Sequence, residues 1–265
     1  MKKLLFTLLF LTLGTAWGGV LEDGLAAFDR KDYATALRLW RPLAEQGDVQ
    51  AQSRLGVMYI LGRGVLQDYK EAVKWYRLAA EQGDAHAQFA LGSLYARGDG
   101  IARNYSESVK WYKLAAAQGN AEAEYFLGAD YFIGRGVAQD YVEAIRLFRL
   151  AAEQGHANAQ TKLGWMYDEG QGVLQDYKEA VKWYRLAAEQ GDAPAQTGLG
   201  FMYFNGQGVL QDYARAHMWY NLASAAGEAI AIKTRDLVAK LMTPQQIEKA
   251  QEMAKACQAS NFKGC

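Results

Sequence analysis

Histidines are the first side chains to consider for general acid–base or nucleophilic chemistry in this chain. There are three of them, His86, His156 and His217. They occupy unrelated places in the sequence pattern: the second position of a helix, a cap and the middle of another helix. A catalytic histidine needs a nucleophile or a carboxylate within hydrogen-bond reach, and the spacing predicts no such set. We therefore expect structural or surface roles for all three, and no enzymatic activity.

Carboxylates and cysteines are the other candidates, and their spacing also favours structural roles. Glu71 precedes Lys74 by three residues, the spacing at which helix side chains pair. The sequence contains no cluster of cysteines, histidines or carboxylates suited to a metal, so we expect neither metal nor cofactor. Cys257 and Cys265 lack the C-x-x-C spacing common in redox catalysis. In an exported chain, such a pair predicts a disulfide that closes a small loop.

The charge balance argues against a nucleic-acid partner. The chain has 29 basic and 29 acidic residues, so no global field draws it to nucleic acid or to an anionic membrane. Its glycine loops resemble phosphate cradles superficially. Each loop is followed by a helix-capping position that is usually Asp, and that carboxylate would repel phosphate.

Residues 1–18 have the layout of a secretory signal peptide. Lys2 and Lys3 precede an apolar run from Leu4 to Leu13, and the small residues Ala16 and Gly18 suit a cleavage site. The alternative is a membrane anchor. A spanning helix needs about 20 apolar residues, and this run has roughly half that number. We therefore expect cleavage, no stable membrane insertion, and export to the periplasm, with full secretion as the alternative.

A period of 36 residues organises most of the chain. It is marked by Leu-Gly pairs at 55–56, 91–92, 127–128, 163–164 and 199–200, and the stretch 64–85 recurs residue for residue at 172–193. Five units follow: 49–84, 85–120, 121–156, 157–192 and 193–228. Repeats of this length cannot bury an apolar face alone and must stack on their neighbours.

Each unit predicts two helices. In the first, Ala51, Leu55 and Tyr59 share one face, and a glycine pair ends the helix. Asp68 then caps the second helix, and Glu71 three residues later suggests a capping box. A glycine beside Leu55 costs roughly 1 kcal/mol of helix propensity. Its recurrence predicts a close approach by the neighbouring helix.

The repeated motif resembles that of the Sel-one-like repeat (SLR) family, a relative of the tetratricopeptide repeats. The matching pattern is A-x-A-Q-x-x-L-G-x-M-Y followed by G-x-G-V-x-x-D-Y-x-E-A-x-x-W-Y-x-L-A-A-x-Q-G, and it extends from Val49 to Glu228. The resemblance implies an all-α, right-handed α-α superhelical solenoid of 36-residue helix-turn-helix repeats. We divide the chain into a signal peptide (1–18), an N-terminal capping tetratricopeptide-like repeat (19–48), five Sel-like repeats (49–228) and C-terminal capping helices with a disulfide-closed tail (229–265).

Candidate binding residues lie where the repeats differ from one another. Three positions of the first helix vary from unit to unit and share a stripe distinct from the one built on Leu55. The resemblance implies that this stripe faces a concave, ligand-binding groove, and aromatic side chains are the usual anchors of such surfaces. The alternative is that some of these rings pack between repeats. The candidates are Phe89, Tyr125, Phe132, Trp165, Phe201 and Phe204, with Asp168 near Lys162 as a charged contact.

The leading functional hypothesis is an exported scaffold that binds a partner protein or peptide in its groove. The resemblance implies assembly or regulation of envelope or host-interaction complexes, and a toxin inhibitor or immunity protein would be a special case. The alternative is a cell-wall ligand binder or β-lactam-hydrolysing enzyme, as in a cysteine-rich exported branch of the family. That branch carries a disulfide in each repeat, whereas the cysteines here are confined to the tail, which weakens the transfer.

Overall fold

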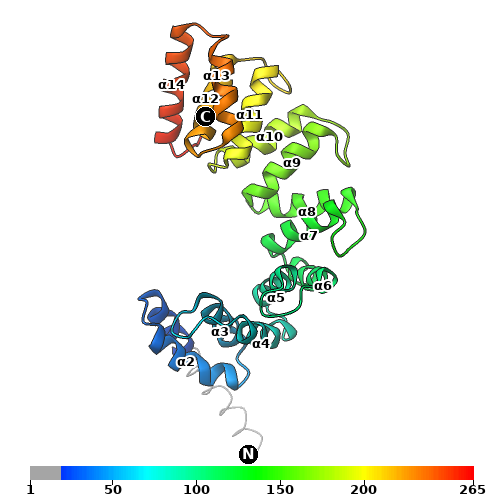
Figure 1. Cartoon of the computed structure of the whole chain (residues 1–265), viewed down its shortest axis with the longest axis vertical. Coiled ribbons are helices and arrows are strands. Elements are labelled where there is room, and N and C mark those ends of the chain that lie inside the picture. Colours follow the sequence, from blue (N-terminus) through cyan, green and yellow to red (C-terminus); the bar gives the residue numbers. More distant parts are fainter. Residues whose placement is uncertain (1–18) are drawn as a thin grey trace, which may run out of the picture. The chain divides into compact units, whose positions relative to one another are not determined.

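The computed structural model describes residues 19–265, so the signal peptide predicted at 1–18 lies outside the described residues. The described part is helical and contains no strand (Figure 1). This confirms the prediction of an all-α solenoid of tandem helix-turn-helix repeats. After a helix at residues 19–29, the helices are α2 (Tyr33–Glu45), α3 (Val49–Leu61), α4 (Tyr69–Glu81), α5 (Ala85–Arg97), α6 (Tyr105–Ala116), α7 (Ala121–Ile133), α8 (Tyr141–Glu153), α9 (Ala157–Glu169), α10 (Tyr177–Ala188), α11 (Ala193–Asn205), α12 (Tyr213–Ala225), α13 (Ala229–Ala239) and α14 (Pro244–Ala259).

The helices belong to two compact units. The first unit extends to Ala123 and also includes Arg135–Val137. The second unit comprises Glu124–Gly134 and Ala138–Cys265. Within the second unit, α9 packs on α10 and α11 packs on α12, so each 36-residue repeat is one helix pair.

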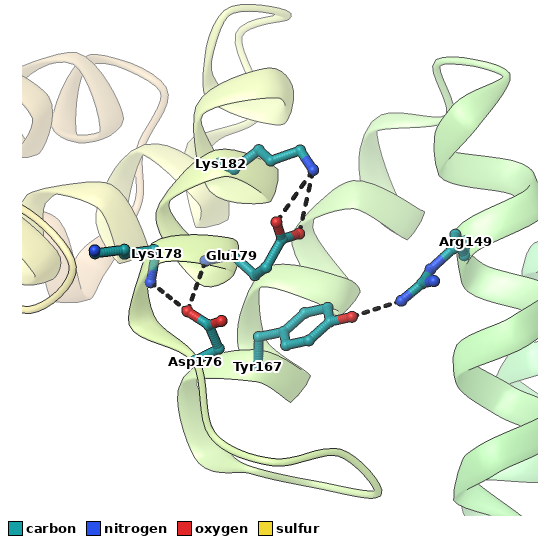
Figure 2. A network of polar contacts seen from close by, with 6 residues as sticks. All are labelled: Arg149, Tyr167, Asp176, Lys178, Glu179 and Lys182. Carbon is teal, nitrogen blue, oxygen red and sulfur yellow. Dashed lines mark hydrogen bonds and ion pairs between the residues drawn. The ribbon is translucent and has the colours of Figure 1, made fainter.

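Helix ends follow from local sequence, as the second half of the fourth repeat illustrates (Figure 2). The Asp176 side chain accepts hydrogen bonds from the backbone N–H groups of Lys178 and Glu179, at 2.9 and 3.1 Å. Glu179 pairs with Lys182 at 3.2 Å instead of returning a bond to the cap. The predicted N-cap is therefore confirmed, but the second half of the capping box is wrong here, because a lysine one turn away offers the carboxylate an opposite charge. The equivalent Asp68 cap and Glu71–Lys74 pair repeat this pattern.

The glycine in each Leu-Gly pair makes room for an aromatic ring. A Cβ built on Gly164 would lie 2.6–2.9 Å from ring carbons of Tyr184, and a Cβ on Gly56 would lie 2.8 Å from the Tyr76 ring. The close approach predicted from the sequence is thus made by a ring of the second helix in the same repeat. A side chain at Gly164 or Gly56 would overlap with the facing ring.

Buried glutamines link neighbouring repeats. In the second unit, Gln160 donates to the carbonyl of Ala152 at 3.0 Å and accepts from Gln190 at 2.8 Å. The third repeat has Glu124 at the equivalent position, 3% exposed, where it accepts from Gln154 at 2.7 Å. Burial raises the pKa of the Glu124 carboxyl above its ordinary value. Satisfying these polar groups internally fixes the stacking of one repeat on the next.

The C-terminal end is closed by α13 and α14. Thr243 caps α14 with both halves of a capping box, through the backbone and side chain of Gln246. The Cys257–Cys265 disulfide expected from the sequence is present, and Cys257 is buried beside α12. The tail is thereby tied to the last helix pair.

Candidate functional site

The aromatic stripe predicted from the sequence is assembled in the second unit by the first helices α7, α9 and α11. Phe132 of α7 meets Trp165 of α9 edge to face, with ring centroids 5.8 Å apart, and it also packs on Tyr141 at 5.1 Å. Lys162 lies above both rings, its Nζ 3.9 Å from the Phe132 centroid and 4.3 Å from that of Trp165. The structure therefore brings two of the predicted residues together around Lys162, which is not part of the repeated motif.

Tyr125 stacks on the scaffold at the N-terminal end of α9. Its ring centroid is 4.6 Å from that of His156 and 5.8 Å from that of Phe148. His156 caps α9, because its Nδ1 accepts from the backbone N–H of Ala159 at 3.2 Å. The predicted capping role of this histidine is confirmed.

The remaining stripe residues differ in exposure. Phe201 of α11 is 46% exposed. Phe204 is half-buried and packs on Tyr213 at 5.6 Å. Phe89 belongs to the first unit, where it stacks on Tyr112 at 5.8 Å. Most of these rings therefore pack against a neighbouring ring, and each keeps some surface exposed.

An open pocket of about 400 Å³ lies on this face of the second unit. Two predicted residues, Tyr125 and Trp165, line it. Sequence reasoning did not include the other lining residues among the sites. Tyr184 and Asp192 recur in the repeats, so the sequence pattern indicates a structural role for them. Pro194 is one of three prolines in the chain and is a sequence signal that could have indicated this site. The full lining is Tyr125, Asn158, Thr161, Lys162, Trp165, Tyr184, Asp192 and Pro194.

Two polar groups that line the pocket form no hydrogen bond or ion pair with the described part of the scaffold. Among the residues that the structure describes, no carboxylate pairs with Lys162, and burial lowers the pKa of its ammonium. The Tyr184 side chain is 5% exposed, and its hydroxyl has no hydrogen-bond partner within that same part of the chain. Asp192, in contrast, is used: its Oδ1 accepts from Thr161 Oγ1 at 2.9 Å and from the N–H of Ala195 at 2.8 Å.

Asp168 lies on the stripe but does not line the pocket. Burial raises the pKa of its carboxyl to about 6, and the neighbouring charge of Glu169 adds to the effect. The Asp168 charge in turn contributes to the raised pKa of Tyr184, behind the larger effect of burial. A change of pH near 6 therefore alters the charge close to the pocket.

A smaller pocket of about 130 Å³ lies in the first unit. Arg54 occupies the repeat position that Lys162 has in the fourth repeat, and its guanidinium carbon is 5.4 Å from the Trp40 ring centroid. The Arg54 Nε is buried without a hydrogen-bond partner. The pocket is lined by Leu25, Phe28, Asp29, Trp40, Arg54 and Val57.

The other chemically active groups are dispersed. His86 is the second residue of α5, and His217 is buried in α12, where burial lowers its pKa. Across residues 19–265, no three histidine, cysteine or carboxylate side chains gather as metal ligands would. None of the helices described is both long and apolar enough to span a bilayer.

Comparison with known proteins agrees with this geometry. The sequence model of the Sel1 repeat matches six times, at residues 16–48, 49–84, 85–120, 121–156, 157–192 and 193–228. The first match includes residues 19–48, for which the sequence predicts a tetratricopeptide-like cap, so the chain matches six Sel1 repeats and not five. No curated protein matches the chain.

Two solved structures are similar in both sequence and fold. One is c5321, a protective antigen present in uropathogenic Escherichia coli strains that displays an SLR fold; it is 38% identical, with a TM-score of 0.83 over 89% of this chain and 52% of that one. The present chain therefore spans about half the length of c5321. The other is a Sel1 repeat protein from Oxalobacter formigenes, 36% identical, with a TM-score of 0.77 over 89% of this chain and 96% of that one.

Proposed function

Because this chain belongs to the Sel1 repeat family, whose repeats form non-catalytic scaffolds that typically serve protein–protein interaction, we propose that it is an exported scaffold that binds a partner protein or peptide along its first helices. The groove is the face formed by α7, α9 and α11 in the second unit. The binding residues in this unit are Tyr125, Phe132, Trp165, Asp168, Phe201 and Phe204, together with Lys162 and the rest of the pocket lining.

The pocket beside Trp165 is the observation that carries this proposal. Stacked aromatic rings and a proline supply rigid apolar surface, and such anchors dominate the energetics of protein interfaces. Tyr125 is already held by packing on His156, and Trp165 by packing on Phe132. A partner side chain would therefore dock without the entropic cost of ordering them.

One observation supports an exported location, and one supports the type of complex. The Cys257–Cys265 disulfide suits an oxidising compartment such as the periplasm. The similar E. coli protein is a protective antigen, which supports a role in host-interaction or envelope complexes for this chain as well.

Site-specific photocrosslinking tests the proposal. A photoreactive phenylalanine analogue is placed at Phe201, on the groove, or at Leu174, a loop residue that is 92% exposed. Both substitutions replace exposed apolar side chains, so both variants should fold. In native cells, we expect a covalent adduct of defined mass from position 201 only. Equal adducts from both positions, or an adduct from position 174 alone, would move the partner away from the groove.

A further inference from the structure

The repeat fold does not require a lysine at position 162. The equivalent positions of the other repeats are Arg54, Ala90, Phe126 and Gly198, and the repeat closes in every case. Among the described residues its ammonium contacts two aromatic rings and no carboxylate. Cation–π contacts compensate only in part for the water that a half-buried ammonium has lost. An ammonium has three donors, so Lys162 can pair with an anion that enters the pocket.

The Tyr184 hydroxyl supplies a second unused donor. Its ring is held between two glycines: a Cβ on Gly164 would lie 2.6 Å from it, and a Cβ on Gly198 2.8 Å. The glycine at 198 is specific to the fifth repeat, and any side chain there would displace the ring. The hydroxyl thus stays at the pocket wall, fixed in place and without a partner among the described residues.

We propose that this pocket recognises an acidic side chain and an adjacent aromatic side chain within an extended segment of the partner. The carboxylate pairs with Lys162 and accepts a hydrogen bond from the Tyr184 hydroxyl. The aromatic side chain packs against Trp165, Tyr125 and Pro194. This inference rests on the proposed function and names the chemistry of the partner.

Charge complementarity favours this occupant. Pairing with a carboxylate would give Lys162 a charge-assisted hydrogen bond, the stronger class of hydrogen bond. The acidic group in the pocket lining, Asp192, is already stabilised by two hydrogen bonds at the start of α11. Asp168 and Glu169 lie outside the lining, and their charges act on Tyr184 less than burial does. Aromatic surface extends beyond the pocket lining at Phe132 of α7, which contacts Trp165 and Lys162, and α11 carries the half-exposed Phe201. A segment that passes through the pocket would also reach the Phe132 ring next to it.

Blocked hexapeptides test the chemistry directly on the full mature chain. The probe is Ac-Gly-Ala-Glu-Phe-Ala-Gly-NH2, and its matched controls replace Glu with Gln or Phe with Ala. A fourth peptide, Ac-Gly-Ala-Gln-Phe with a free terminal carboxylate, tests a chain end as the source of the anion. Binding is followed by the NMR shift of the Trp165 indole N–H, assigned with Trp165→Phe. We expect the Gln peptide to bind about tenfold more weakly than the Glu peptide, the factor that corresponds to about 1.4 kcal/mol.

Two lysine variants connect the preference to the pocket. Lys162→Met keeps the apolar stem and removes the charge, so it should abolish the preference for Glu over Gln. Lys178→Met removes a charge from an exposed position outside the pocket and should leave the preference unchanged. Circular dichroism establishes that both are folded.

The inference fails if wild type binds the Glu and Gln peptides equally, if Lys162→Met keeps the preference, or if the free-carboxylate peptide binds best. Its failure is distinguishable from failure of the proposed function. Suppose that the Lys162→Met variant still crosslinks a partner from position 201 with unchanged yield. The groove would then remain the proposed binding site, and only the inferred acidic segment of the partner would be refuted.

Discussion

Replacing Gly164 with alanine would place a methyl group against the ring of Tyr184. The new Cβ would lie 2.6, 2.8 and 2.9 Å from three ring carbons. Carbon atoms pack best at about 3.5–4.0 Å, so the ring would have to move by roughly 1 Å. It has little room, because Tyr184 is 5% exposed and is packed in a cluster with Ala187 and Leu199, both fully buried.

Two effects oppose each other in this variant. Alanine is favoured over glycine inside a helix by about 1 kcal/mol. Overpacking a close-packed core costs about 1–3 kcal/mol, and the short contacts with a rigid ring place this site in the upper part of that range. We therefore expect Gly164→Ala to lower the free energy of unfolding by about 1–2 kcal/mol.

The third repeat provides a matched comparison. A Cβ on Gly128 would lie 3.0 Å from the nearest ring carbons, those of Phe148, so the overlap is smaller. The gain in helix propensity is the same, and we expect Gly128→Ala to be nearly neutral. Both variants are measured by urea unfolding, followed by circular dichroism and by amide hydrogen exchange in α9 and α10, because repeat arrays can unfold in more than one step. A stabilised Gly164→Ala protein, or equal losses in the two variants, would refute the packing argument.

Three further predictions concern single contacts. Asp176→Ala removes the cap of α10 and should cost about 1 kcal/mol of unfolding free energy in urea titrations, with Asp176→Asn as the conservative control. Asp168 has a folded-state pKa of about 6, above its ordinary value of 3.8. Protonation therefore favours the folded state, and this stabilisation, complete below about pH 4, is lost as the pH rises through 6. Asp168→Asn should remove that part of the pH dependence of the urea midpoint, and an unchanged profile would argue against a buried carboxyl. Replacing Cys257 and Cys265 with serine should weaken the attachment of α14 by roughly 2–3 kcal/mol, seen as faster hydrogen exchange or proteolysis confined to the C-terminal end.

Much of the scaffold was readable from the sequence because its signals are local and periodic. The caps Asp68 and Thr243 act on backbone N–H groups two or three residues away, and the helix-ending glycine at 62 adopts a left-handed conformation that depends on its own lack of a side chain. Only part of the candidate site could be predicted from the sequence. Variation between repeats indicated Tyr125 and Trp165 as candidates. It could not indicate Tyr184, because a residue that recurs in other repeats is expected to be structural.

By itself, the sequence determined the family, the helix-pair repeat and the helix ends, since each of these depends on residues that are close together or separated by a fixed period. Only the tertiary structure decided which side chains meet. It set Lys162 over Phe132 and Trp165, turned Glu179 toward Lys182, and left the Tyr184 hydroxyl unused at a pocket wall. These outcomes depend on rings, charges and glycines from α7, α9, α10 and α11 competing for the same space, and that competition is settled by packing in three dimensions.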